Sequence, residues 1–134
     1  MTDHVNVIVH RRTEFSLGRI LIHPKETREL SSKFCLQQTL TKNFNVGQLV
    51  LSSSSTDGLE VLEIHLGWKK VELPVGNKVM VSDFHYKNPC LSWLRGMLYA
   101  GQTASVWIRN VGIQPVKVAG MLWSVQENAL ERKP

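Results

Sequence analysis

Residues 103–125 read TASVWIRNVGIQPVKVAGMLWSV, and apolar and more polar side chains alternate through both halves of this stretch. Val106 and Ile108 share one parity, residues 110–112 contain the turn-forming Asn and Gly, and the alternation resumes at Val116. Successive side chains of a β-strand point to opposite faces, so a period of two predicts strands and not helices. The stretch therefore predicts two strands joined by a turn, each with one buried face.

The same period of two recurs along the rest of the chain. In residues 61–66, for example, Leu62, Ile64 and Leu66 share one parity, which predicts that they lie on one face. The other segments with strand character are 4–10, 15–22, 33–41, 46–51 and 79–81, and the breaks between them are 43–47, 52–58, 74–77, 88–89 and 100–101. About eight to ten short strands at spacings of about ten residues are typical of an all-β sandwich or barrel.

Only two stretches have the composition of a helix, namely the polar segment 24–31 and the tail 126–133. A chain of 134 residues has the usual length of one domain and can bury about two-thirds of its unfolded surface. The sequence contains no linker, repeat or low-complexity tract beyond four consecutive serines. We therefore expect residues 1–134 to form a single β-sandwich domain with a short polar tail at 127–134.

Composition excludes several other classes of protein. Apolar residues make up 43% and charged residues 20% of the chain, as in an ordinary globular protein. The longest apolar runs, such as residues 20–22, are too short to span a bilayer, and the N-terminus has no signal-peptide core. We expect a soluble protein that is intracellular at synthesis. Cys35 and Cys90 are too few for a disulfide framework and are expected to be free thiols, with a disulfide between them as the alternative.

Motifs that carry catalysis or bind cofactors are missing from the sequence. The five histidines include no HxxxH pair, and neither a GxSxG elbow, a GxGxxG loop nor a P-loop occurs. Asp83 lies two residues before His85, and a surface hydrogen bond is a more common outcome for such a pair than an acid/base couple. We therefore predict no catalytic residue, no metal site and no cofactor. An enzyme whose residues converge from distant strands is the alternative.

The net charge of +5 favours acidic partners, although the basic residues occur only as short doublets. Trp107 precedes Arg109 by two residues, as Trp93 precedes Arg95, so on a strand each pair shares a face. Such a tryptophan could stack on a base while the guanidinium meets a phosphate, or both could pack against protein. The candidate ligand or nucleic-acid surface comprises Arg11, Arg12, Trp68, Lys69, Lys70, Trp107, Arg109 and Lys117.

The last apolar segment is two-sided. Ala119, Met121, Trp123 and Val125 share one parity, while Val118 and Leu122 of the other parity are apolar as well. A strand with one hydrated face should alternate, so this strand is either covered by another layer or in contact with a second subunit. We predict a homo-oligomer with Ala119, Met121, Trp123 and Val125 in its interface.

Residues 98–123, LYAGQTASVWIRNVGIQPVKVAGMLW, resemble the late hairpin of jelly-roll β-sandwich proteins. Viral coat subunits and the TNF/C1q-like heads of phage and virus fibres have similar patterns. The resemblance covers about a fifth of the chain and carries over no functional residue. It implies a jelly-roll-like antiparallel sandwich and a structural or attachment protein associated with a virion, as a capsid, decoration or fibre-head component. Only Arg11 and Arg12 could replace the long basic arm of small coat proteins, which favours decoration or a fibre head over genome packaging.

Overall fold

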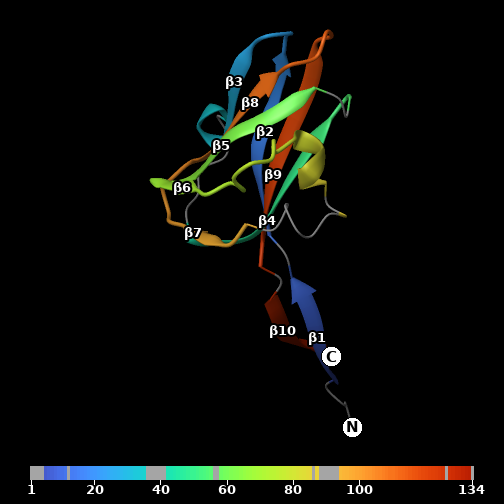
Figure 1. Cartoon of the computed structure of the whole chain (residues 1–134). Helices are drawn as coiled ribbons and strands as arrows, with labels where there is room; N and C mark the ends of the chain where they lie inside the picture. The colour runs from blue at the N-terminus through green and yellow to red at the C-terminus, as the bar shows by residue number, and fades with distance from the viewer. Residues whose placement is uncertain are drawn as a thin grey trace.

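The computed structural model describes residues 5–11, 13–35, 42–55, 58–85, 87, 94–125 and 127–133, and for 5–11 and 127–133 it describes the backbone strands. These residues form an all-β structure (Figure 1). Its strands are β1 (Val5–Arg11), β2 (Glu14–Ile22), β3 (Thr27–Ser31), β4 (Phe44–Ser53), β5 (Leu59–Leu66), β6 (Lys69–Val71), β7 (Gly96–Leu98), β8 (Ala104–Asn110), β9 (Val116–Ser124) and β10 (Glu127–Lys133). Two short 3-10 helices, η1 (Ser32–Phe34) and η2 (Val81–Phe84), lie in the connections.

Strand pairing is nested from the ends of the chain to its middle. β1 pairs with β10, β2 with β9, β3 with β8, β4 with β7 and β5 with β6, all antiparallel. Rolling this long hairpin up adds the pairs β4–β9 and β5–β8. Two four-stranded sheets result, with the orders β2-β9-β4-β7 and β3-β8-β5-β6. This is the connectivity of a jelly-roll sandwich, so the predicted antiparallel β-sandwich is confirmed.

The hydrophobic core lies between the two sheets and is built from their inward-facing side chains. The sheet β2-β9-β4-β7 contributes Phe15, Leu17, Ile22, Phe44, Val46, Leu49, Leu51, Leu98, Val116, Val118 and Leu122, and the sheet β3-β8-β5-β6 contributes Leu30, Leu59, Val61, Ile64, Leu66, Ala104, Val106 and Ile108. The rings of Phe15 and Phe44 stand 6.0 Å apart between their centroids. The alternation of 105–109 and 116–122 in the sequence therefore marks the buried faces of β8 and β9 correctly.

A β-bulge changes the predicted face of β5. The register of β5 against β8 shifts between Val61 and Glu63, so two residues of β5 face one position of its partner. Val61 and Ile64 are consequently both buried, while Leu62 is only half-buried. The prediction that Leu62 shares the buried face with Ile64 and Leu66 was wrong, because a strict period of two does not pass through a bulge.

The two stretches that could be helical contain strands instead. Residues 24–31 contain β3, which pairs with β8, and residues 126–133 contain β10, which pairs with β1. In both cases a ladder of backbone hydrogen bonds with a distant strand overrides the local preference. Of the predicted strand 33–41, Lys33 and Phe34 lie in η1, and residues 36–41 lie outside the described residues.

The paired strands β1 and β10 form a ribbon that projects from the sandwich (Figure 1). Their register runs from Val5 opposite Lys133 to Arg11 opposite Glu127. The ribbon continues the β2–β9 pairing outward and so brings the two ends of the nested hairpin side by side. No helix within the described ranges is long and apolar enough to cross a membrane.

Candidate functional site

The Asp83–His85 pair serves the local backbone. The Asp83 carboxylate accepts a hydrogen bond from Met80 N at 2.9 Å and so closes the first turn of η2. The ring Nδ1 of His85 accepts from Lys87 N at 3.2 Å. Over the part of the chain that the structure describes, no three His, Cys, Asp or Glu side chains are grouped so that they could hold a metal ion. The Cys35 thiol is half-buried, with Sγ 3.8 Å from Ser16 O, and Cys90 lies outside the described residues.

The outer face of the sheet β3-β8-β5-β6 carries paired charges. Arg109 Nη2 lies 2.8 Å from Glu60 Oε2 on the neighbouring strand, so its guanidinium already has a carboxylate partner. Trp107 stands on the same face, between Glu29 of β3 and Glu63 of β5. As predicted, Trp107 and Arg109 lie on one face, but acidic side chains surround them.

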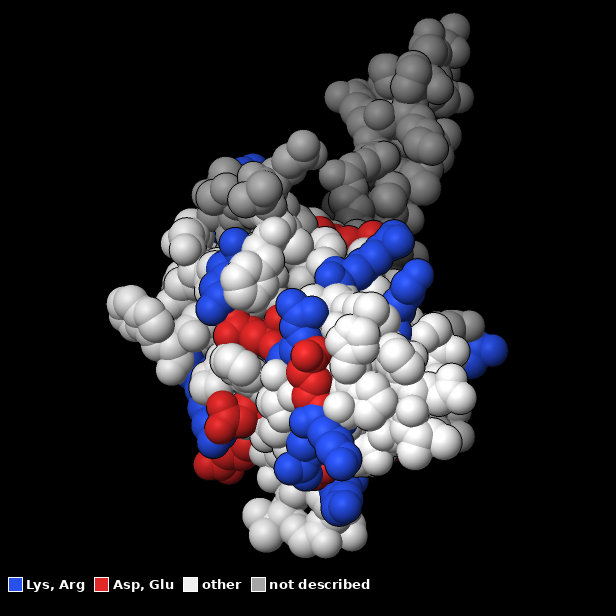
Figure 2. All heavy atoms as spheres, turned by 90° about the horizontal axis from the view of Figure 1, so that it is seen from above, with Lys and Arg blue, Asp and Glu red and all other residues white. Residues whose placement is uncertain are grey.

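Further ion pairs complete this charged face. Lys33 Nζ lies 2.7 Å from Glu29 Oε1, and Lys70 Nζ lies 3.4 Å from Glu63 Oε1. The other oxygen of Glu63 lies 3.0 Å from His65 Nε2. The hydrogen bond with His65, followed by the interaction with Lys70, lowers the pKa of the Glu63 carboxyl group. On the side of the molecule that Figure 2 shows from above, basic and acidic side chains are interleaved.

Trp68 occupies the turn between β5 and β6 and is 95% exposed. Together with Tyr99, which is 56% exposed, it lines a hollow of about 550 Å³ between this turn and the β7–β8 loop. Hydrogen bonds hold the two loops in place, from Gly67 N to Thr103 O at 2.9 Å and from Tyr99 N to Gln102 Oε1 at 2.9 Å. The indole is the largest of three apolar side chains that the described loops expose by more than 90%, with Val75 and Ile113 as the others.

Of the predicted ligand residues that the structure describes, Lys70, Trp107 and Arg109 share the outer face of one sheet, and Lys117 lies on the other sheet. Trp68 and Lys69 belong to the β5–β6 hairpin, Trp107 and Arg109 to β8, and Lys117 to the other sheet. Lys70 lies beside Glu63 in an ion pair. For Arg11 the structure describes only the strand backbone, and Arg12 and Trp93 lie outside the described residues.

The outer face of the other sheet has an apolar centre. β9 lies between β2 and β4, with Ala119, Met121 and Trp123 half-buried on its outward side and Val50 of β4 opposite Met121. We call Val50, Ala119, Met121 and Trp123 the β9 apolar face. Val125 follows the strand and is 36% exposed. One side of β9 thus lies in the core, and its other side carries the β9 apolar face.

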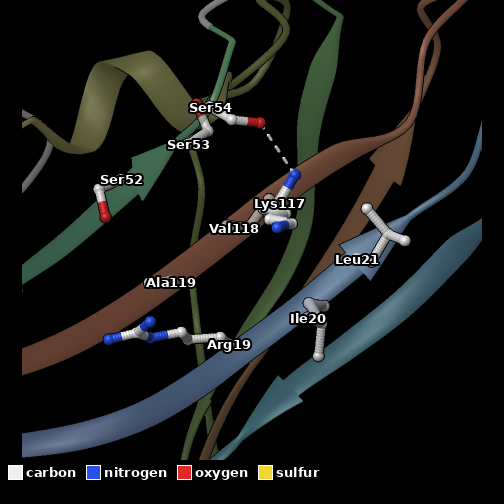
Figure 3. Close-up of a pocket in the computed structure, with 9 residues that line it drawn as sticks. All are labelled: Arg19, Ile20, Leu21, Ser52, Ser53, Ser54, Lys117, Val118 and Ala119. Carbon is white, nitrogen blue, oxygen red and sulfur yellow. Dashed lines mark hydrogen bonds between the residues drawn. The ribbon is translucent and has the colours of Figure 1, made fainter.

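A shallow groove of about 600 Å³ adjoins the β9 apolar face at Ala119 (Figure 3). Arg19 of β2 is paired with Ala119, and Ala119 is paired with Ser52 of β4. Arg19 and Ser52 lie on opposite sides of Ala119 (Figure 3). At the next position of the same face, Lys117 N donates to Ser54 Oγ at 3.1 Å, and Ser54 N donates to Lys117 O at 3.0 Å.

The sequence did not identify this groove. Residues 52–58 were expected to be a break between strands, whereas Ser52 and Ser53 belong to β4. The outward parity of Lys117 follows from its alternation with Val116 and Val118, whereas Arg19 shares the parity of the buried Phe15 and Leu17 and faces outward because of a β-bulge between Ser16 and Gly18. Only the register between three distant strands brings the two cations beside the serines.

Comparisons with known proteins found no matching family model, no similar curated protein and no similar solved structure.

Proposed function

We propose that this chain is a non-enzymatic structural or attachment protein that acts as a homo-oligomer, with the β9 apolar face in the contact between subunits. The observation that carries the proposal is the difference between the outer faces of the two sheets. One face presents ion pairs, including Glu60–Arg109 and Glu63–Lys70. The other presents uncharged, mostly apolar side chains from two adjacent strands at its centre.

The chemistry of the β9 apolar face suits a second copy of the same surface. Tryptophan and methionine are enriched in protein interfaces, and charged residues are depleted from interface centres. A two-fold contact is self-complementary, so Met121 and Trp123 of one subunit can pack against the same residues of the next. The charged face of the other sheet stays in water, where its ion pairs suffer no desolvation penalty.

Light scattering coupled to size-exclusion chromatography tests the assembly. The wild-type chain should elute as an oligomer, and Met121→Lys should shift it to a lower mass because a charge would be buried in the contact. Ile113→Lys is the matched control, since Ile113 is 91% exposed in the β8–β9 connection and should leave the mass unchanged. A wild-type protein that stays monomeric at all accessible concentrations would refute the proposed assembly.

The attachment part of the proposal rests on Trp68 and Tyr99. An indole that is 95% exposed gains little from folding, but it offers a large apolar surface to a ligand. We infer a sugar ring as the ligand, since its C–H face can stack on the indole. Binding to a glycan array should be lost in Trp68→Ser and retained in Ile113→Ser. Equal binding by Trp68→Ser would exclude this surface.

The nucleic-acid alternative has weaker support. Its central pair, Trp107 and Arg109, lies among glutamates, and the ion pair between Arg109 and Glu60 would have to break for a phosphate to bind. The repulsion between these carboxylates and a phosphate backbone would oppose binding at this face.

A further inference from the structure

We propose that the groove between β2, β9 and β4 is a binding site for an oxyanion group, a phosphate or sulfate monoester, held by Arg19, Lys117 and the hydroxyl of Ser52. The site borders the proposed subunit contact at Ala119 and shares no residue with the Trp68 hollow. It is built from three strands that are far apart in the sequence and adjacent in the sheet.

The strand register places Arg19, Ser52 and Lys117 around Ala119, which forms the floor of the groove. Arg19, Ala119 and Ser52 occupy one row across the sheet, and Lys117 follows two residues away on the same face. Directly opposed side chains in a sheet have Cβ atoms about 4.5–5.5 Å apart, and diagonal neighbours about 7–8 Å. Because Ala119 ends at its Cβ atom, the space above it is left to the longer side chains (Figure 3).

The two cations lack a carboxylate partner among the residues that the structure describes. The ion pairs of Lys33, Lys70 and Arg109 lie on the other sheet or next to it. The nearest acid along the outward face of β2 is Glu14, which is paired with Trp123 and not with Ala119. Two neighbouring positive charges without a counter-charge repel one another, and a bound anion would relieve that repulsion.

The hydrogen-bond donors match an anion with several oxygens. A guanidinium can bind two oxygens of a phosphate or sulfate at once, and an ammonium adds a further charged donor. Ser54 Oγ already accepts from Lys117 N, so its own hydrogen is available to donate, while Ser52 is exposed at the edge of the groove. A tetrahedral oxyanion presents enough acceptors for Arg19, Lys117 and Ser52, with Ser54 Oγ as a further donor.

The short extent of positive charge at the groove favours a small ester over a polymer. The surroundings of the two cations are neutral, with Leu21 at one end and the β9 apolar face at the other. A nucleic-acid strand would require a longer track of positive charge.

NMR titration of the wild-type chain tests the proposal. The probes are sodium phosphate and sodium sulfate against sodium chloride at equal ionic strength, followed by glucose 6-phosphate and N-acetylglucosamine 6-sulfate. Saturable shifts are expected at the backbone amides of 52–54 and 117–119. Tighter binding of one ester identifies the natural group as phosphate or sulfate, respectively.

Matched variants distinguish the groove from general charge attraction. Arg19→Gln and Lys117→Gln should each weaken ester binding by about tenfold, as expected for loss of one charge-assisted contact. Arg19→Lys should restore part of the affinity, and Lys78→Gln, which removes an exposed charge elsewhere, should leave it unchanged. Amide chemical shifts that match those of the wild type away from the substituted residue show that each variant keeps the fold. Shifts spread over many surface cations, or equal affinity in Arg19→Gln and Lys117→Gln, would overturn the proposal.

Discussion

Gly120 of β9 faces Leu30 of β3 across the sandwich, so closely that a Cβ atom added at Gly120 would lie 2.6 Å from Leu30 Cδ2. Leu51 Cδ2 and Leu17 Cδ1 would lie at 3.1 and 3.3 Å from the same atom, and Leu30 is fully buried. The two sheets therefore approach one another at a position where only a hydrogen atom fits.

Gly120→Ala should consequently destabilise the fold by overpacking. Inserting a methyl group into a filled core costs about 1–3 kcal/mol in the free energy of unfolding. The measurement is the urea midpoint, followed by circular dichroism. Leu30→Val added to Gly120→Ala should return part of the loss, because the two changes share one space. A Gly120→Ala protein as stable as wild type would contradict the close approach of the sheets.

Asn110 is a buried polar residue that joins three segments. Its Nδ2 donates to Ile22 O at 2.9 Å and to Gln114 O at 2.7 Å, while its Oδ1 accepts from Gly112 N at 2.9 Å. Asn110→Asp keeps the acceptor but loses both donors, leaving two carbonyl oxygens facing a carboxylate. We expect a loss of about 3 kcal/mol or more in unfolding free energy.

Denaturant titration at neutral pH measures the effect of Asn110→Asp. Val75→Ala, at a position that is 99% exposed, serves as a surface comparison and should change the midpoint little. If Asn110→Asp unfolds at the wild-type midpoint, the side-chain amide does not hold β2 and the β8–β9 connection together.

Glu63 should make stability depend on acid pH. Its pKa is lowered in the folded chain, first by the hydrogen bond with His65 and then by Lys70. The unfolded chain therefore binds the proton more tightly, so the contribution of Glu63 is present above the ordinary glutamate pKa and is lost as the pH falls through the lowered folded value. Glu63→Gln should flatten this acid-side slope.

Carbon-detected NMR of the Glu63 carboxyl group measures its titration directly. The midpoint should lie below that of an unperturbed glutamate. It should rise in His65→Ala, because this change removes the hydrogen bond that contributes most to lowering the pKa of Glu63. A Glu63 midpoint at the ordinary value in the wild-type chain would disprove the interaction in solution.

Trp68 should be dispensable for folding. Because its side chain is 95% exposed, Trp68→Ser should change the unfolding free energy by less than about 0.5 kcal/mol. Trp123→Ser, at a half-buried position of β9, should cost more. Thermal unfolding of both variants checks the ranking, and a larger loss in Trp68→Ser than in Trp123→Ser would show that the turn is packed differently.

Local sequence pattern was sufficient for the class of the fold. Val106 and Ile108 of β8 are buried as their parity predicts, and so are Val116 and Val118 of β9. The two-sided character of β9 was also visible, because it depends only on which side chains the strand carries. Where a strand contains a bulge, as at Val61 and Glu63, the parity changes and the same reasoning fails.

Pairing between distant segments decided the strands and side-chain contacts that the local pattern did not predict. The polar segments 24–31 and 126–133 became strands because β8 and β1 offer them backbone partners. Trp107 and Arg109 share a face as expected, but Glu60 reaches the guanidinium only through the pairing of β5 with β8.

The sequence by itself determined that the chain forms short strands with one apolar face, because alternation is a property of neighbouring residues. The tertiary structure alone decided which strands lie side by side, and therefore that Arg19, Lys117 and Ser52 surround one groove. The physical reason is that register is selected by burial of whole faces and by backbone hydrogen bonds between segments far apart in the chain, which no single segment encodes.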